Sequence, residues 1–212
     1  MDLHLVDLGG GFGGAYQKHD PALVLVLLRE GYRRLAKKYA MLFGKARVAV
    51  ESGRYLTASA GKFIVSVLGR KESRGRTFVV CDGGYNHHSA ASFIGRHHGN
   101  RFPIRKVGRE GGQEMVTVVG PTGTPVDLLA NDVRLGKVES DALLCLDYSG
   151  AYCYTNSCQL FFSAPSPAEV LTYKGRTYLL RARTVPEDLL DNQRPLPEEC
   201  IAHPSKIMMD AH

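Results

Sequence analysis

The chain has 212 residues, of which 44% are hydrophobic and 23% charged, and its formal net charge at pH 7 is +6. This is a globular composition and excludes a disordered or fibrous protein. No apolar run reaches the ~20 residues that span a bilayer, and residues 1–15 lack the layout of a secretory signal, so we expect a cytoplasmic protein that does not bind membranes.

Five cysteines occur without C-x-x-C spacing, which predicts reduced thiols rather than a disulfide framework or a zinc site. The basic residues are scattered, and their densest group lies on one expected helix. We interpret that group as a solvated helix face and expect no nucleic-acid partner. Its members are Arg29, Arg33, Arg34, Lys37 and Lys38.

The first 60 residues are expected to form a parallel βα unit. Residues 3–8 predict a strand that ends in a glycine run. Asp20 and Pro21 predict the start of a helix whose apolar periodicity continues to Gly44. Residues 46–50 predict a second strand that runs directly into Glu51. A functional residue at the carboxyl end of a strand is typical of (β/α)8 barrels, and residues 1–60 therefore resemble the last part of such a barrel.

Residues 61–185 are rich in predicted strands separated by turn residues, which favours an antiparallel barrel or sandwich. The strand candidates are Phe63–Leu68, Thr77–Cys81, Glu114–Val119, Asp141–Leu146 and Thr177–Arg183. Residues 186–212 are rich in Pro, Glu and Asp and are expected to form a tail. Two strands cannot close a barrel by themselves, so we expect the first segment to need a complement.

Three motifs carry the expected chemistry. Glycines 9, 10, 11 and 13 can direct backbone N–H groups at a phosphate, although a simple strand-to-helix turn would use the same residues. Glu51 and Arg54 place an acid and a base on one short turn, where a surface ion pair is the alternative. Gly150-Ala151-Tyr152 follows later, and a buried core tyrosine is the alternative there.

In this order, the motifs resemble the fold-type III pyridoxal-phosphate-dependent amino-acid decarboxylases, which include the ornithine, diaminopimelate and arginine enzymes. Cys81-Asp82-Gly83-Gly84, Gly120-Pro121-Thr122 and Pro167-Ala168-Glu169-Val170-Leu171 add to the resemblance. It implies a (β/α)8 barrel remnant followed by a mainly antiparallel β-barrel like the C-terminal domain of alanine racemase. It covers the second half of such an enzyme, and the lysine that carries the cofactor lies in the first half of family members. No residue of this sequence inherits that role.

The resemblance also implies roles for single residues. Glycines 9, 10, 11 and 13 and Tyr152 would bind the cofactor phosphate, Arg54 would lie near it, and Glu51 would keep the pyridine nitrogen protonated. Asp82, His87 and Asp127 are weaker candidates for substrate binding. Adjacent His87 and His88 point opposite ways on extended backbone, so we expect no metal site.

Gly123 stands where active family members usually carry a cysteine that acts as proton donor across the dimer interface. General acid catalysis is worth about 10²–10⁴-fold in rate, so its loss should impair turnover more than cofactor binding.

The leading hypothesis is the C-terminal half of a decarboxylase of L-amino acids, free or tethered to a carrier protein, inactive without its lysine-bearing half. Asn86 to Ser92 and Thr124 to Asp127 resemble the carrier-protein branch. A homodimer, or a complementing N-terminal half, is the implied partner. The alternative is a noncatalytic relative that binds an intact decarboxylase or a regulator, and racemase chemistry is a weaker third possibility.

Overall fold

A computed structural model describes residues 3–17, 19–44, 46–92, 102–109 and 111–197. The chain divides into two compact units, Met1–Phe161 and Phe162–His212. The first unit contains all the motifs expected to carry chemistry. The division into segments at residues 60 and 185 stays a prediction.

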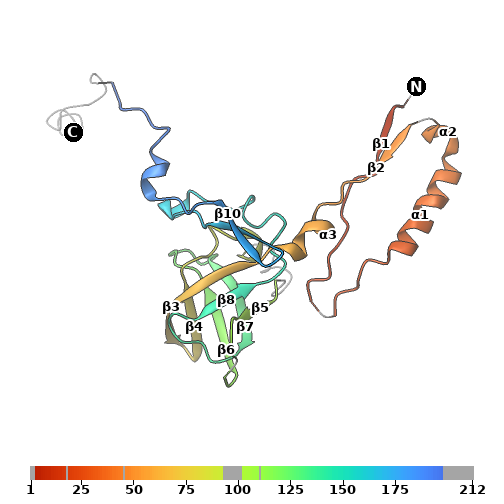
Figure 1. The fold of residues 1–212 in the computed structure, drawn as a ribbon. Helices are drawn as coiled ribbons and strands as arrows, with labels where there is room; N and C mark the ends of the chain where they lie inside the picture. Colours follow the sequence, from red (N-terminus) through yellow and green to blue (C-terminus); the bar gives the residue numbers. More distant parts are fainter. Residues whose placement is uncertain (1–2, 18, 45, 93–101, 110, 198–212) are drawn as a thin grey trace, which may run out of the picture. The chain divides into compact units, whose positions relative to one another are not determined.

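The first unit opens with the predicted parallel βα unit (Figure 1). Strands β1 (Leu5–Asp7) and β2 (Arg47–Ala49) pair in parallel, and helices α1 (Leu25–Lys38) and α2 (Ala40–Phe43) lie between them in the sequence. The predicted single helix is interrupted at Tyr39, and Gly44 ends the helical stretch with a φ of 44°. Both predicted strands are confirmed, and β2 ends two residues before Glu51.

The predicted helix start at Asp20 is wrong. Helix α1 begins at Leu25, and its N-cap residue Val24 provides no side-chain hydrogen bond. The Asp20 carboxylate instead accepts hydrogen bonds from the backbone N–H groups of Tyr16 and Gln17, each at 2.8 Å. An aspartate can satisfy N–H groups before it in the chain as readily as those after it, so the capping pattern was misleading here.

The rest of the unit is dominated by a six-stranded sheet with the order β5-β8-β3-β4-β6-β7 (Figure 1). Its strands are β3 (Phe63–Ser73), β4 (Arg76–Cys81), β5 (Ile104–Lys106), β6 (Glu114–Val119), β7 (Leu128–Leu135) and β8 (Leu143–Leu146). Strands β4 and β6 pair in parallel, and the other four pairings are antiparallel. The outer strands β5 and β7 also contact each other, so the sheet nearly closes into the predicted mainly antiparallel barrel.

Apolar side chains fill the barrel. Its largest fully buried apolar side chains are Val65, Val67, Val79, Val116, Val118, Val138, Leu144 and Leu146. Burial alternates along β3 and β4 with the period of two that is typical of a strand, whereas β6 and β8 each have three consecutive buried residues. Strands β3, β4, β6 and β8 were predicted, although β3 extends to Ser73, beyond its predicted end, whereas β5 and β7 were missed.

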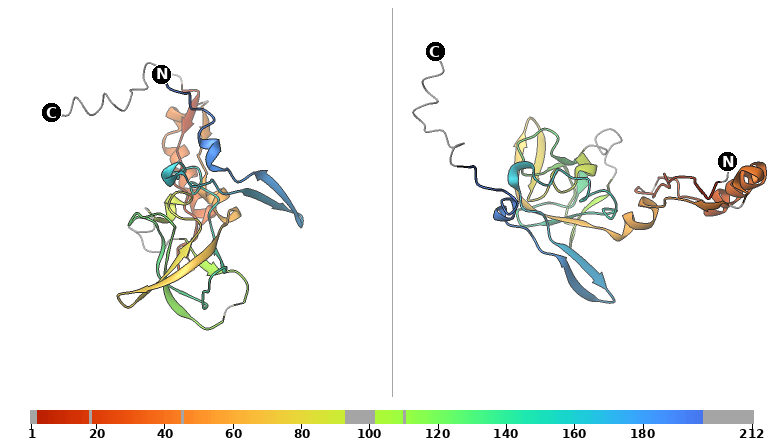
Figure 2. Two further views of the ribbon diagram at one scale, coloured as in Figure 1. Left: turned by 90° about the vertical axis from the view of Figure 1, so that its left-hand side faces the viewer. Right: turned by 90° about the horizontal axis from the view of Figure 1, so that it is seen from above.

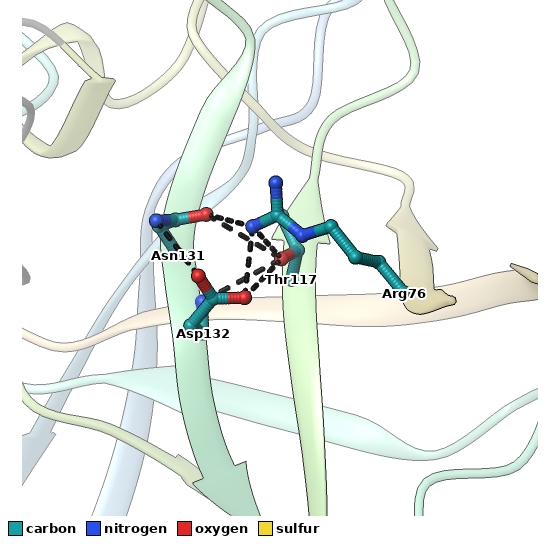
Figure 3. Close-up of polar contacts among 4 residues, drawn as sticks. All are labelled: Arg76, Thr117, Asn131 and Asp132. Atoms are coloured by element: carbon teal, nitrogen blue, oxygen red, sulfur yellow. Dashed lines mark hydrogen bonds and ion pairs between the residues drawn. The ribbon is translucent and has the colours of Figure 1, made fainter. Parts of the chain in front are cut away.

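A β-bulge explains why β7 was missed. The register of β6 and β7 shifts so that Thr117 faces both Asn131 and Asp132, and Asp132 takes a φ of 47°. Figure 3 shows the Arg76 guanidinium reaching from β4 to this point. Its Nη2 atom donates to Asn131 Oδ1 at 2.6 Å, Asp132 Oδ1 at 2.8 Å and Thr117 Oγ1 at 3.2 Å. Asn and Asp disfavour regular strands but suit a bulge.

The second unit is built on a hairpin of β9 (Glu169–Tyr173) and β10 (Arg176–Arg181), drawn in blue in Figure 2. Lys174 and Gly175 form the two-residue turn with positive φ at both positions, which matches the twist of the strands. Strand β10 was predicted and β9 was not. The 3-10 helix η3 (Pro186–Leu189) follows at the start of the predicted tail, whose residues 198–212 lie outside the described residues.

Among the residues that the structure describes, no helix combines the length and apolar character needed to cross a membrane.

Candidate functional site

The glycine run forms a tight loop against the end of β2. Gly9 and Gly11 have φ values of 72° and 84°, a region that glycine enters without steric strain. The Gly9 N–H donates to Asp7 Oδ1, and the Gly9 carbonyl accepts from the Glu51 N–H, both at 2.8 Å. A Cβ at Gly10 would overlap the Glu51 carbonyl oxygen. The loop therefore requires glycine, and it fixes the backbone of Glu51.

Arg54 and Tyr152 meet beside this loop. Arg54 begins the short helix α3 (Arg54–Thr57), and its guanidinium carbon lies 5.6 Å from the centroid of the Tyr152 ring. The Tyr152 hydroxyl lies next to Gly53, where an added Cβ would be 3.4 Å away. Tyr152 is 55% exposed, so it is not a core tyrosine.

A junction of close backbone contacts holds Tyr152 at this place. The Ser149 N–H donates to the Gly61 carbonyl at 2.9 Å, and the Gly150 N–H donates to the Ala58 carbonyl at 3.0 Å. A Cβ at Gly150 would overlap the Thr57 carbonyl oxygen. Glycine at position 150 therefore lets two segments about 90 residues apart in the sequence pack backbone to backbone.

These residues surround a hollow of about 600 Å³, within the usual size range of ligand pockets. It is lined by Gly10, Gly11, Phe12, Glu51, Ser52, Gly53, Arg54 and Tyr152. Five predicted cofactor residues therefore come together, while Gly9 and Gly13 belong to the same loop but do not line the hollow. Phe12, Ser52 and Gly53 were not predicted, although each is a sequence neighbour of a predicted residue.

The donor set fits a phosphorylated ligand. A glycine loop, a guanidinium and a phenol supply hydrogen-bond donors and positive charge for a phosphate, and Glu51 adds one carboxylate. Within the described ranges, no three His, Cys, Asp or Glu side chains come together as a metal site would require.

The three weaker substrate candidates do not line this hollow. Asp127 is 3% exposed, and its carboxylate accepts the Tyr85 N–H at 2.6 Å and the Thr122 N–H at 2.8 Å. His87 is buried beside Asn86, and exposed Asp82 accepts the Ser66 N–H at 2.8 Å. Their contribution to substrate binding stays a prediction, and Asp127 clearly joins two loops of the barrel.

Two cysteines close to the functional segments are protonated at neutral pH. Burial raises the pKa of the Cys81 thiol to about 12 and that of the Cys153 thiol to about 11. A thiol is a poor nucleophile in this state. Cys153 directly follows Tyr152 in the sequence, but its thiol is buried.

Comparison with known proteins decides the family. A profile of the C-terminal sheet domain of pyridoxal-dependent decarboxylases matches residues 14–150, more than half of the chain. The chain belongs to this decarboxylase family. The resemblance inferred from the motifs is thereby confirmed, and family members depend on pyridoxal phosphate.

Relatives of this family match nearly the whole chain. The L-glutamyl-[BtrI acyl-carrier protein] decarboxylase of Niallia circulans is 35% identical over 194 residues, which cover 89% of this chain and 45% of the relative. The diaminopimelate decarboxylase of Archaeoglobus fulgidus is 31% identical over 204 residues, which cover 93% and 46%. The chain thus spans about 45% of the length of these decarboxylases.

The fold agrees with the sequence comparison. The crystal structure of diaminopimelate decarboxylase from M. jannaschii in complex with L-lysine superposes with a TM-score of 0.82 at 26% identity. The match covers 92% of this chain and 44% of that enzyme.

Proposed function

We propose that this chain forms the C-terminal half of a pyridoxal-phosphate-dependent decarboxylase of L-amino acids. The observation that carries the proposal is the convergence of the glycine loop, Glu51, Arg54 and Tyr152 on one hollow. About 140 residues separate the ends of this set in the sequence, and family membership supports pyridoxal phosphate as the ligand of the hollow.

Each residue has a separate task in this proposal. The N–H groups of Gly10 and Gly11 and the Arg54 guanidinium hold the phosphate, and the Tyr152 hydroxyl donates a further hydrogen bond to it. Glu51 holds a proton on the ring nitrogen. When bound, the cofactor accepts the electrons released as the substrate loses its carboxylate.

Residues 1–60 act in this proposal as the last part of a (β/α)8 barrel. No residue of α1 is buried, and an apolar hollow of about 500 Å³ lies between α1 and the β1–β2 pair. Leu28, Tyr32 and Val48 are among its lining residues. The remaining strands and helices of a barrel would cover these faces and supply the lysine that carries the cofactor. The complete enzyme would be a cytoplasmic homodimer.

A carrier-tethered amino acid is the favoured substrate class. The relative from Niallia circulans, whose name specifies a glutamyl group on an acyl-carrier protein, is 35% identical to this chain. The diaminopimelate decarboxylases are the competing model for a free amino acid.

A noncatalytic decarboxylase-like partner or regulator is the second candidate function. Gly123 is exposed in the loop after β6, where the resemblance expects a proton-donating cysteine. No lysine lines the described cofactor hollow.

Borohydride reduction of the natively expressed protein tests the proposal, because it fixes a cofactor imine covalently to its lysine. We expect intact-mass measurement and peptide mapping to find the label on a lysine outside these 212 residues, in the same polypeptide or in a copurifying one. A label on a lysine of this sequence would contradict the proposal. Absence of label after addition of pyridoxal phosphate would favour the noncatalytic alternative.

A further inference from the structure

The segment that carries Tyr152 has a strained backbone. Tyr148 and Tyr152 both have a φ of 60°, a conformation that bulky residues rarely adopt. Such strain persists only where the surrounding structure fixes it and is concentrated at functional sites. The backbone contacts of Ser149 and Gly150 described above supply part of this support.

His88 supplies a side-chain contact to the same segment. Its Nε2 atom lies 3.0 Å from Ser149 Oγ, and its Nδ1 atom accepts the Ala91 N–H at 3.1 Å. The Ser149 hydroxyl donates its own proton to the Leu146 carbonyl at 2.9 Å. The imidazole Nε2–H must therefore donate to Ser149, which defines one neutral tautomer.

Aromatic packing fixes the imidazole. His88 is fully buried, with its ring centroid 4.6 Å from that of Phe102 and 5.4 Å from that of Phe63. Phe102 in turn contacts Tyr16 at 5.3 Å, and Tyr16 contacts Tyr148 at the same distance. Tyr16 lies two residues after the glycine run, so one aromatic cluster joins the segment that follows the glycine loop to the segment that carries Tyr152.

We propose that His88 is a positioning residue for phosphate recognition, acting through its hydrogen bond to Ser149 to set the place of the Tyr152 hydroxyl. The inference rests on the proposed function, since it assumes that Tyr152 contacts the cofactor phosphate. It assigns a task to a histidine that does not line the hollow.

Two substitutions of His88 distinguish the contributions of its two ring nitrogens, Nε2 and Nδ1. His88→Gln places an amide N–H near the original Nε2 and can still donate to Ser149. His88→Asn places its amide near the original Nδ1 and cannot reach Ser149. Ser149→Ala removes the acceptor. We expect His88→Asn and Ser149→Ala to weaken pyridoxal phosphate binding about two- to tenfold, the range of one lost hydrogen bond, and His88→Gln to restore most of the affinity.

Calorimetric titration of the 212-residue chain with pyridoxal phosphate measures the affinity, and hydrogen exchange measures the protection of the amides at positions 149 and 150. Both amides should exchange faster in His88→Asn and Ser149→Ala than in His88→Gln. Thr117→Val, which removes a hydrogen bond from the Arg76 cluster, is the matched control for a general loss of stability. Arg54→Met is the control for loss of phosphate binding.

The outcomes separate the inference from the proposed function. Equal affinity and exchange in His88→Asn, Ser149→Ala and the wild type would overturn the inference alone. Equal, measurable affinity in the wild-type chain and in Arg54→Met would count against the proposed phosphate site, and the exchange measurement would still decide whether His88 positions the segment. Equal losses in His88→Gln and His88→Asn would show that packing, not the hydrogen bond, matters, and would also overturn it.

Discussion

Asp127 illustrates how a single buried carboxylate organises two loops. It accepts the N–H groups of Tyr85 and Thr122 and the Thr122 hydroxyl, and a Cβ at Gly84 or Gly120 would overlap its Oδ1 atom. Its hydrogen-bond acceptors are therefore used inside the protein. A substitution that leaves the partners of such a buried group unsatisfied lowers the free energy of unfolding more than one that removes the group together with its partners.

We expect Asp127→Asn to lower the free energy of unfolding by about 2 kcal/mol, because the amide NH₂ would face N–H donors. Denaturant unfolding followed by circular dichroism measures this change. Asp82→Asn is the matched control, since Asp82 is exposed and accepts a single N–H, from Ser66. Equal losses of unfolding free energy in the two variants would show that the buried contacts of Asp127 stabilise the protein no more than the single exposed contact of Asp82.

At the scale of elements, the bulge between β6 and β7 is held by one guanidinium. Arg76 and Asp132 are about half exposed, so their ion pair is worth little by itself, but Asp132 also occupies the positive-φ position. Asn tolerates that conformation and keeps an acceptor oxygen for Arg76, whereas Ala does neither.

Asp132→Ala should therefore destabilise the barrel by about 1 kcal/mol, and Asp132→Asn by less than half of that. Chemical unfolding of the two variants beside the wild type makes the comparison. Indistinguishable variants would mean that neither the left-handed backbone nor the guanidinium contact limits the stability of this bulge.

At the scale of the molecule, stability should decline towards acid pH. Burial lowers the pKa of His88 from 6.5 to about 4, so between these values the unfolded chain binds more protons than the folded one. The contribution of neutral His88 to stability is therefore fully present above pH 6.5. It is lost as the pH falls towards 4, by at most ~1.4 kcal/mol per pH unit.

Glu114 adds a second loss of stability in acid. Burial raises the pKa of Glu114, but the hydrogen bond and positive charge of Arg70 and the hydrogen bond from the Val138 N–H together outweigh burial and lower it. The contribution of ionised Glu114 to stability is therefore present above the pKa of this carboxyl in the unfolded chain, and it is lost as the pH falls through its lower pKa in the folded chain.

The His88→Gln variant tests this pH dependence, because it keeps the hydrogen bond to Ser149 without a titrating ring. We expect its thermal midpoint to fall less than that of the wild type between pH 6.5 and about 4, and both proteins to lose stability in parallel below that range. Parallel curves over the whole range would refute the assignment of the first transition to His88.

Much of the architecture followed from local patterns. Strand-forming runs separated by turn residues located β3, β4, β6 and β8, and the glycine run and Glu51 located the turn where β2 ends. Local patterns failed where a residue's partner lay on the unexpected side of it in the chain or was distant in the sequence. Asp20 matched the pattern of a helix cap, but its carboxylate accepts a hydrogen bond from the Tyr16 N–H, which precedes it in the chain. Strand β7 was not predicted because Asn131 and Asp132 disfavour a strand, and Arg76 stabilises them there from another strand.

The sequence by itself determined the decarboxylase family, the parallel βα unit, the mainly antiparallel barrel and most of the residues that line the hollow beside Glu51, Arg54 and Tyr152. These features depend on glycines required by backbone geometry and on side-chain periodicity, which are local properties. Only the tertiary structure decided that Asp127 joins two loops and that His88 donates to Ser149, 61 residues away. A buried polar group must find a partner wherever the fold places one, and that partner is not encoded in the neighbouring residues.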